Sequence, residues 1–275
     1  MNAPRPHVPA PQPTPPAAPG SRRALVDTNV LLSDPLRRWI KALVAEANAA
    51  AEANAGASEA NAGSAARTAS ISLVWTEDVR RELWDGIPHT HPGISQAGRR
   101  GIERGWLEAC EPEPVTTDDR TVRAYVLDPT DAHLDNAALA GAVTWLVTDD
   151  TRAFAPVDSP LRSRIPYALL TADEFLQLLA AEADDALTRA FRSEVEVAAT
   201  RAARRRARGQ SPRAGRAQSP RAGRGRGSGA GGASAVSPTS ADREAAAREL
   251  VEATRASGAA GFARLLEGFL TAPET

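Results

Sequence analysis

The sequence predicts an α/β protein with a mostly parallel sheet, followed by a small helical extension at its C-terminal end. Short apolar runs recur along the first 170 residues, and amphipathic helical stretches lie between them. This alternation is typical of parallel sheets, because parallel neighbours need a long crossover connection, which is usually a helix. After about residue 171 the pattern is helical only.

The first apolar run, Ala24–Leu32, contains Asp27 and Asn29 and predicts a buried strand that leads into a turn or a helix start. A helix should follow, with Asp34 as its N-cap and Pro35 at the first helical position. Its buried face would carry five apolar side chains, those of Leu36, Trp39, Ile40, Leu43 and Val44.

The other elements follow the same order. Residues 71–75 predict a second strand, and Thr76 should cap a helix that the helix-breaking residues Gly86, Pro88 and Pro92 end. Residues 95–109 predict a polar helix. The remaining expected elements are a helix over 130–142 with Thr130 as N-cap, a strand over 144–147, and a strand and helix within 167–180.

Composition divides the chain further. Residues 1–20 hold eight prolines and predict a disordered leader. The α/β domain should span 21–177, with a low-complexity insertion at about 45–68 that forms either a loop or a frayed helix extension. A helical unit is expected over 178–203 and 240–272, with Ser240 as an N-cap, split by a disordered Arg/Gly/Ser-rich insertion at 204–239.

The formal net charge is -1, but the charges are unevenly placed. Ten of the 33 Lys and Arg residues lie between Arg201 and Arg226, a stretch without acids, which leaves 23 bases against 34 acids elsewhere. A flexible segment of this charge would attract polyanions such as RNA.

Several protein classes are excluded. The single cysteine, Cys110, rules out an intramolecular disulfide framework and a cysteine-based zinc cluster. The longest apolar run, Ala137–Val147, is much shorter than the roughly 20 residues of a membrane span. The N-terminus has no apolar core of a secretory signal, so we expect no membrane association and a cytoplasmic location.

Acidic residues mark one edge of the predicted sheet. Asp27 follows the first strand, Glu82 lies in the helix after the second strand, and Asp131 opens the helix before the strand that Asp149 and Asp150 follow. In parallel sheets such positions can converge on one pocket. A carboxylate cluster is costly unless a cation neutralises it, and hard oxygen ligands favour Mg²⁺ or Mn²⁺.

Taken singly, most of these acids have plainer explanations. Asp131 could be only a helix cap, Asp150 a turn residue and Glu82 an exposed helix charge. Asp27 differs, because an acid within an apolar strand is expected to be buried and then needs a partner. Asp135 could be a fifth acid or a polar helix residue.

Three segments resemble the motifs of PIN-domain nucleases. ALVDTNVLLSDPLR is similar to the opening motif of this family, WTEDVRREL to its Glu-bearing helix, and DPTDAHLDNAALAGAVTWLVTDDTRAF to its second signature. The resemblance covers roughly residues 22–177 and is closest to the bacterial VapC-type ribonuclease toxins. It implies a PIN-like three-layer sandwich.

The resemblance also implies residue roles. It makes Asp27, Glu82, Asp131 and Asp150 the catalytic acids, with Asp27, Asp131 and Asp150 as metal ligands. Asp149 is the rival of Asp150 as a ligand, and Glu77, Asp78 and Asp85 lie near enough to Glu82 to compete for its role. Asn29 and His133 would position substrate, although His133 could equally be an ordinary polar helix residue.

The expected function is therefore a Mg²⁺- or Mn²⁺-dependent endoribonuclease, the toxin of a type II toxin–antitoxin pair. Its partners would be RNA and a cognate antitoxin protein, and the family implies a possible homodimer. One alternative is a non-catalytic RNA-binding or regulatory protein on a PIN scaffold that uses the Arg-rich segment. Another is a phosphatase-like or 5′-nuclease activity on DNA in the same acidic pocket.

Overall fold

A computed structural model describes residues 22–58, 70–117, 125–154, 160, 162–182, 184–209 and 237–271. The predicted leader at 1–20 lies outside these residues. So do the end of the low-complexity insertion, 59–69, and most of the Arg-rich insertion, 210–236.

The described residues form a four-stranded sheet in the order β2-β1-β3-β4, with every pair parallel. The strands are β1 (Arg22–Val26), β2 (Ile71–Val74), β3 (Trp145–Val147) and β4 (Ala168–Leu170). Their apolar composition reflects burial, since Ala24, Leu25 and Val26 of the central strand β1 are fully buried. The predicted α/β fold with a mostly parallel sheet is confirmed.

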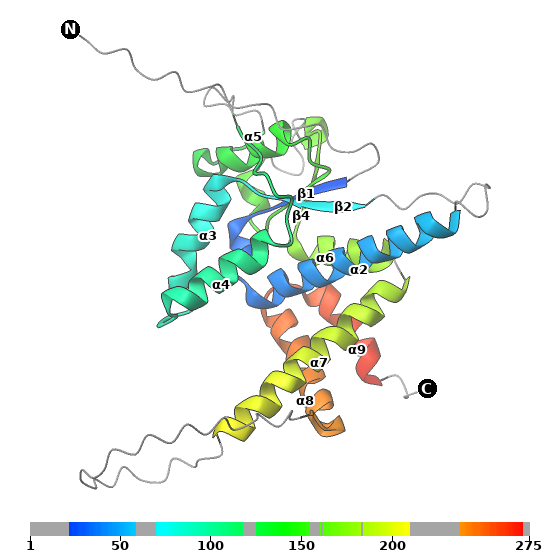
Figure 1. Cartoon of the computed structure of the whole chain (residues 1–275). Coiled ribbons are helices and arrows are strands. Elements are labelled where there is room, and N and C mark those ends of the chain that lie inside the picture. The colour runs from blue at the N-terminus through cyan, green and yellow to red at the C-terminus, as the bar shows by residue number, and fades with distance from the viewer. Residues whose placement is uncertain are drawn as a thin grey trace, which may run out of the picture.

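Helices cover both faces of the sheet (Figure 1). On one side lies α5 (Ala132–Ala140), and on the other lie α2 (Asp34–Ser58) and α6 (Ala172–Glu182). The short α1 (Thr28–Leu31) leaves β1 directly, and α3 (Glu77–Thr90) and α4 (Gln96–Leu107) pack together beside the sheet. Three short 3-10 turns complete the domain, η1 (Pro129–Asp131), η2 (Thr151–Ala153) and η3 (Arg162–Arg164).

One helix boundary differs from the prediction in this part of the chain. Thr76 caps α3 as expected, accepting a 3.1 Å hydrogen bond from the backbone N–H of Val79. The helix nevertheless continues through Gly86 and Pro88 to Thr90. Pro88 is tolerated because it lies in the last turn, and a Cβ on Gly86 would come within 2.7 Å of the Leu32 side chain, so this glycine permits close packing.

The low-complexity insertion adopts the second of its two predicted forms over its described part. Helix α2 continues from the amphipathic segment into the Ala-rich repeats as far as Ser58. Alanine has the highest helix propensity, so the repeats can extend the helix without a large apolar face. Asn48 ties this extension to the sheet, because its side-chain amide exchanges hydrogen bonds of 2.8 and 2.7 Å with the backbone of Ile71.

The C-terminal region consists of α7 (Asp184–Gly209), α8 (Ser240–Ala256) and α9 (Ala260–Thr271), which pack beneath α2 and α6 (Figure 1). Trp39 of α2 joins them. Its ring stacks on Phe191 and meets Phe262 edge-on, and its indole N–H donates to Thr254 at 2.8 Å. The helical extension therefore shares one hydrophobic core with the α/β domain.

Two predictions about this region need correction. Residues 204–209 were expected to be disordered, but they belong to α7. Helix α8 is capped by Thr239 instead of Ser240, because Thr239 and Asp242 form a reciprocal capping box. Among the described residues, no helix is both long enough and apolar enough to cross a membrane.

Candidate functional site

The carboxyl ends of β1 and β3 lie side by side and bring two distant motifs together. Asp27 follows β1 and Thr148 follows β3, and the backbone N–H of Asp27 donates to the carbonyl of Val147 at 2.9 Å. The chain passes from β1 to β2 on one side and then crosses to β3 on the other side of β1, which makes this edge the topological switch point where α/β proteins bind ligands.

Asp27 is buried at this edge, with 7% of its surface exposed. One of its carboxylate oxygens accepts a 2.6 Å hydrogen bond from the hydroxyl of Thr148. Burial raises the pKa of the Asp27 carboxyl and the negative charge of Glu82 adds to this effect, while hydrogen bonds from Thr148 and the backbone oppose it. The side chain is therefore a desolvated carboxylate that would gain from a nearby cation.

Thr148 links three parts of this edge. Besides donating to Asp27, its hydroxyl oxygen accepts from the side-chain amide of Asn29 at 3.2 Å and from the backbone N–H of Asp150 at 3.1 Å. We call Asp27, Asn29 and Thr148 the inner site. Its geometry follows from the register of β1 against β3, because both strands end at this point.

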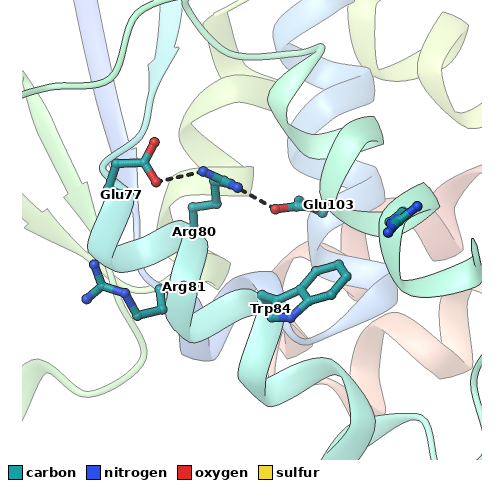
Figure 2. A pocket seen from close by; sticks show the side chains of 6 residues that line it. Glu77, Arg80, Arg81, Trp84 and Glu103 are labelled. Atoms are coloured by element: carbon teal, nitrogen blue, oxygen red, sulfur yellow. Dashed lines mark hydrogen bonds and ion pairs between the residues drawn. The ribbon is translucent and has the colours of Figure 1, made fainter. Parts of the chain in front are cut away.

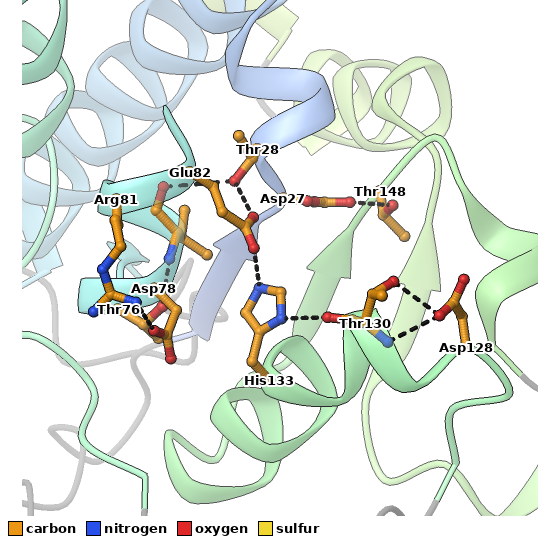
Figure 3. Close-up of polar contacts among 11 residues, drawn as sticks. Asp27, Thr28, Thr76, Asp78, Arg81, Glu82, Asp128, Thr130, His133 and Thr148 are labelled. Carbon is orange, nitrogen blue, oxygen red and sulfur yellow. Dashed lines mark hydrogen bonds and ion pairs between the residues drawn. The ribbon is translucent and has the colours of Figure 1, made fainter. Parts of the chain in front are cut away.

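Glu82 approaches the inner site from α3 (Figure 3). The Thr28 hydroxyl donates to its carboxylate at 2.9 Å, and Nε2 of His133 lies 3.4 Å from its other oxygen. Nδ1 of His133 lies 2.9 Å from the carbonyl of Thr130 and must donate to it, which turns Nε2 toward Glu82. Glu82 thus bridges the residue after Asp27 and the helix that Asp131 begins.

The other acids near Glu82 are paired elsewhere. Glu77 contacts Arg80, Asp78 contacts Arg81, and Asp85 contacts Arg99. The structure therefore directs only Glu82, of these four acidic side chains, to the residues beside Asp27.

Asp131 stands at the start of α5, where the prediction had placed Thr130. Thr130 lies inside η1. The Asp128 side chain caps that turn, because it accepts 2.8 Å hydrogen bonds from the backbone N–H and from the hydroxyl of Thr130. Asp131 has no capping hydrogen bond from its side chain. Burial raises the pKa of Asp131, and the charges of Asp27, Asp128 and Asp150 raise it further, while His133 lowers it.

Asp149 and Asp150 have different environments, although they are adjacent. The Asp149 carboxylate accepts a 3.0 Å hydrogen bond from the backbone N–H of Ala172 at the start of α6, a favourable place for a negative charge. Asp150 begins η2 without a capping bond from its side chain and acts electrostatically on Asp131. We call Glu82, Asp131, His133 and Asp150 the outer site.

Asp135 is not part of this arrangement. It is fully buried and accepts hydrogen bonds from the hydroxyl of Tyr167 at 2.5 Å and the backbone N–H of Tyr125 at 3.2 Å. Burial raises the pKa of Tyr167, and the hydrogen bond to the Asp135 carboxylate and its charge raise it further. Asp135 is a buried residue of α5 whose carboxylate is occupied by these hydrogen bonds.

The donor set fits a divalent cation with oxygen ligands. Asp27, Asp131 and Asp150 are carboxylates at one edge of the sheet, and the charges of Asp27 and Asp150 both act on Asp131. In the described part of the chain, however, no three His, Cys, Asp or Glu side chains already converge as a metal-binding group. Hydrogen bonds from Thr148 and Thr28 hold Asp27 and Glu82 in their present positions.

One comparison with known proteins bears on this site. Residues 23–152 match the family model of the PIN domain, and this segment contains Asp27, Glu82, Asp131 and Asp150. This segment of the chain is therefore similar to a PIN domain. Domains of this family are generally nucleases that use divalent metals, which agrees with an acidic edge at the switch point of the sheet. No curated protein and no solved structure matches the chain.

One feature near this site is not apparent from the sequence. A hollow between α3 and α4 is lined by arginines and Trp84 (Figure 2). The arginines at 80, 81, 99 and 100 are visible in the sequence, but only the packing of the two helices shows which of them face the same space.

Proposed function

We propose that the chain is a metal-dependent endoribonuclease. The observation that carries the proposal is the placement of three carboxylates at one edge of the sheet, where Asp27 follows β1, Asp131 begins α5 and Asp150 begins the turn after β3, all within the segment that matches the PIN family model. Such an edge is poor in compensating cations and rich in oxygen donors, which is the environment that Mg²⁺ and Mn²⁺ select.

Asp27, Asp131 and Asp150 would hold the cation, and Asp150 is preferred to Asp149 because the latter serves the start of α6. A bound divalent cation would supply activation of water and stabilisation of the charge that develops on the phosphodiester. The products would carry a 5′-phosphate and a 3′-hydroxyl, as the family resemblance implies.

The other residues of the site would orient the reactants. Thr148 fixes one oxygen of the Asp27 carboxylate. The amide of Asn29, held by Thr148, could donate to a phosphate oxygen. The His133 ring, which lies between Thr130 and Glu82, would help to position the substrate beside Glu82.

The test is cleavage of labelled RNA by the full chain with Mg²⁺, with Mn²⁺ and with EDTA. Asp27→Asn should lower the rate on the order of 10³-fold or more while the fold is retained, since it removes a residue on which the whole site depends. Asp149→Asn is the matched control, with the same change of charge at the same edge. An Asp27→Asn protein that cleaves at the wild-type rate would exclude this assignment.

The choice of substrate needs its own comparison. Single-stranded RNA, structured RNA and flap DNA should be offered in parallel, and we expect cleavage of RNA. Cleavage of flap DNA alone would favour the 5′-nuclease alternative. RNA binding that deletion of 210–236 abolishes, with no cleavage of any substrate, would favour the non-catalytic binding protein.

The toxin role is a further part of the proposal and rests on the resemblance to VapC-type proteins. Induced expression of the wild-type chain in a bacterium should arrest growth, and Asp27→Asn should not. Growth arrest by both proteins, or by neither, would contradict this role.

A further inference from the structure

The hollow between α3 and α4 has a volume of about 420 Å³ and lies outside the acidic site. Six residues line it, namely Glu77, Arg80, Arg81, Trp84, Arg100 and Glu103 (Figure 2). Three of these are cations, two are anions and one is a large aromatic residue. This composition is that of a surface that receives a charged, partly planar ligand.

Its cations are not equally available. Arg80 is held between Glu77 at 2.7 Å and Glu103 at 2.8 Å, which fixes it as part of the wall. Arg81 contacts Asp78 at 2.8 Å, but its side chain is 68% exposed, so the ion pair contributes little and can exchange. Arg100 is exposed and forms no ion pair or hydrogen bond with any residue that the structure describes.

Trp84 is half-buried, and a neighbouring side chain holds its ring in one orientation. The guanidinium of Arg99 lies over its ring, 3.8 Å from the ring centroid, in a cation–π contact. Arg99 is in turn held by Asp85 at 3.3 Å. The indole therefore forms part of the wall of the hollow as a rigid planar surface.

The hollow lies close to the acidic site along the chain. Arg81 precedes Glu82 directly on α3, and it borders the hollow in Figure 2 and the polar contacts of Glu82 and His133 in Figure 3. An α-helix with its side chains is only about 10–12 Å wide. A few nucleotides of single-stranded RNA are enough to pass around α3 from one side to the other.

We propose that the α3–α4 hollow binds a nucleotide of the RNA substrate that flanks the cleaved bond. The base stacks on Trp84, and the neighbouring phosphates contact Arg81 and Arg100. Stacking on an aromatic residue beside arginines is how proteins bind single strands without reading their sequence. This inference rests on the proposed function, since it names RNA as the ligand.

An acidic peptide would also be attracted to Arg81 and Arg100, but its acidic side chains would not stack on the indole ring of Trp84. The test therefore separates charge from stacking. Full-length protein carrying Asp27→Asn, which prevents cleavage, is titrated into a fluorescein-labelled 12-nucleotide RNA, and binding is followed by anisotropy at several salt concentrations.

Arg100→Glu should weaken RNA binding several-fold, and the loss of one phosphate contact should reduce the dependence on salt by about 0.7 in log–log slope. Arg104→Glu is the matched control, because Arg104 is exposed on the same helix and does not line the hollow. Equal losses for the two variants would overturn the proposal, because they would show only a change of net charge.

Trp84→Leu should weaken binding roughly 10-fold with an unchanged salt slope, and Trp84→Phe should restore most of it. An oligomer of the same length without bases should respond to Arg100→Glu and not to Trp84→Leu. A Trp84→Leu protein of native stability that binds RNA normally would contradict the proposal. So would binding of a poly-glutamate peptide in place of RNA.

The outcomes for the hollow and for catalysis are distinguishable. RNA binding by Asp27→Asn that depends on the α3–α4 hollow, with no cleavage by the wild type, would support the proposal for the hollow and contradict the nuclease proposal. Metal-dependent cleavage by the wild type, with Arg100→Glu and Arg104→Glu acting alike, would support the nuclease and overturn the proposal for the hollow.

Discussion

The inner and outer sites are held in place by different means. Asp27 and Thr148 are buried, and their positions follow from two adjacent parallel strands. Glu82 and Asp150 are exposed and come from a helix surface and a turn. A change in the inner site should therefore affect stability as well as activity, whereas a change in the outer site should affect activity alone.

The largest expected effect within the outer site separates two neighbouring acids. Asp150→Asn should lower the cleavage rate roughly 10²- to 10³-fold. The free energy of unfolding should stay within about 0.5 kcal/mol of the wild-type value, because the Asp150 side chain is exposed and makes no capping hydrogen bond. Asp149→Asn should retain most activity and lose about 0.5–1 kcal/mol of stability, since it weakens the carboxylate contact at the start of α6. Cleavage rates measure the effect on activity, and urea denaturation measures the effect on stability. If Asp149→Asn lost activity and Asp150→Asn kept it, Asp149 would be the ligand.

Thr148→Val tests the inner site. The change keeps the shape of the side chain but removes its hydrogen bonds to Asp27, Asn29 and Asp150. We expect a loss of about 1–3 kcal/mol in the free energy of unfolding and a 10- to 100-fold loss of activity. Thr148→Ser keeps the hydroxyl and should recover both. An active, fully stable Thr148→Val protein would mean that the hydroxyl does not organise this edge.

Glu82→Gln tests the outer site at α3. Glutamine can still accept from Thr28 but loses the charge facing His133. Activity should fall about 10-fold, and the free energy of unfolding should change by less than about 0.5 kcal/mol. Glu77→Gln is the control on the same helix and should have no effect on activity. A loss of stability as large as that of Thr148→Val would remove the distinction between the two sites.

The smallest effect concerns the charge of Asp27. Because burial raises the pKa of this carboxyl in the folded state, the stability that protonation provides is lost as pH rises through that pKa. Asp27→Asn should therefore melt above the wild type at pH 7.5 in EDTA, by roughly 2–4 °C for each kcal/mol gained. The gap should narrow toward pH 4. A lower melting temperature for the variant at pH 7.5 would contradict the raised pKa.

The sequence indicates the burial of Asp27 more clearly than it distinguishes Asp149 from Asp150, for a physical reason. An acid inside an apolar strand, such as Asp27, is informative by itself because burial demands a partner. Asp149 and Asp150 are equivalent in sequence, and what separates them is the start of α6 at Ala172, which only the packed structure brings to Asp149. The residues that face the α3–α4 hollow likewise depend on how the two helices meet.

Helix ends were less predictable than helix positions. Pro88 predicts a helix end, yet α3 continues past it because a proline in the last turn disrupts little. In the same way, α7 continues over residues 204–209, which were predicted to begin the disordered Arg/Gly/Ser-rich insertion. Arginine itself is a good helix former, so charge alone did not mark the boundary.

The most direct test of the account is a calorimetric titration of Mn²⁺ into the full-length chain, with cleavage of labelled RNA measured on the same samples. The account predicts saturable binding and cleavage for the wild type and for Asp149→Asn, and loss of both for Asp27→Asn. Failure of the wild type to bind Mn²⁺ or Mg²⁺, or undiminished cleavage by Asp27→Asn, would contradict the assignment of this edge as a metal-dependent nuclease site.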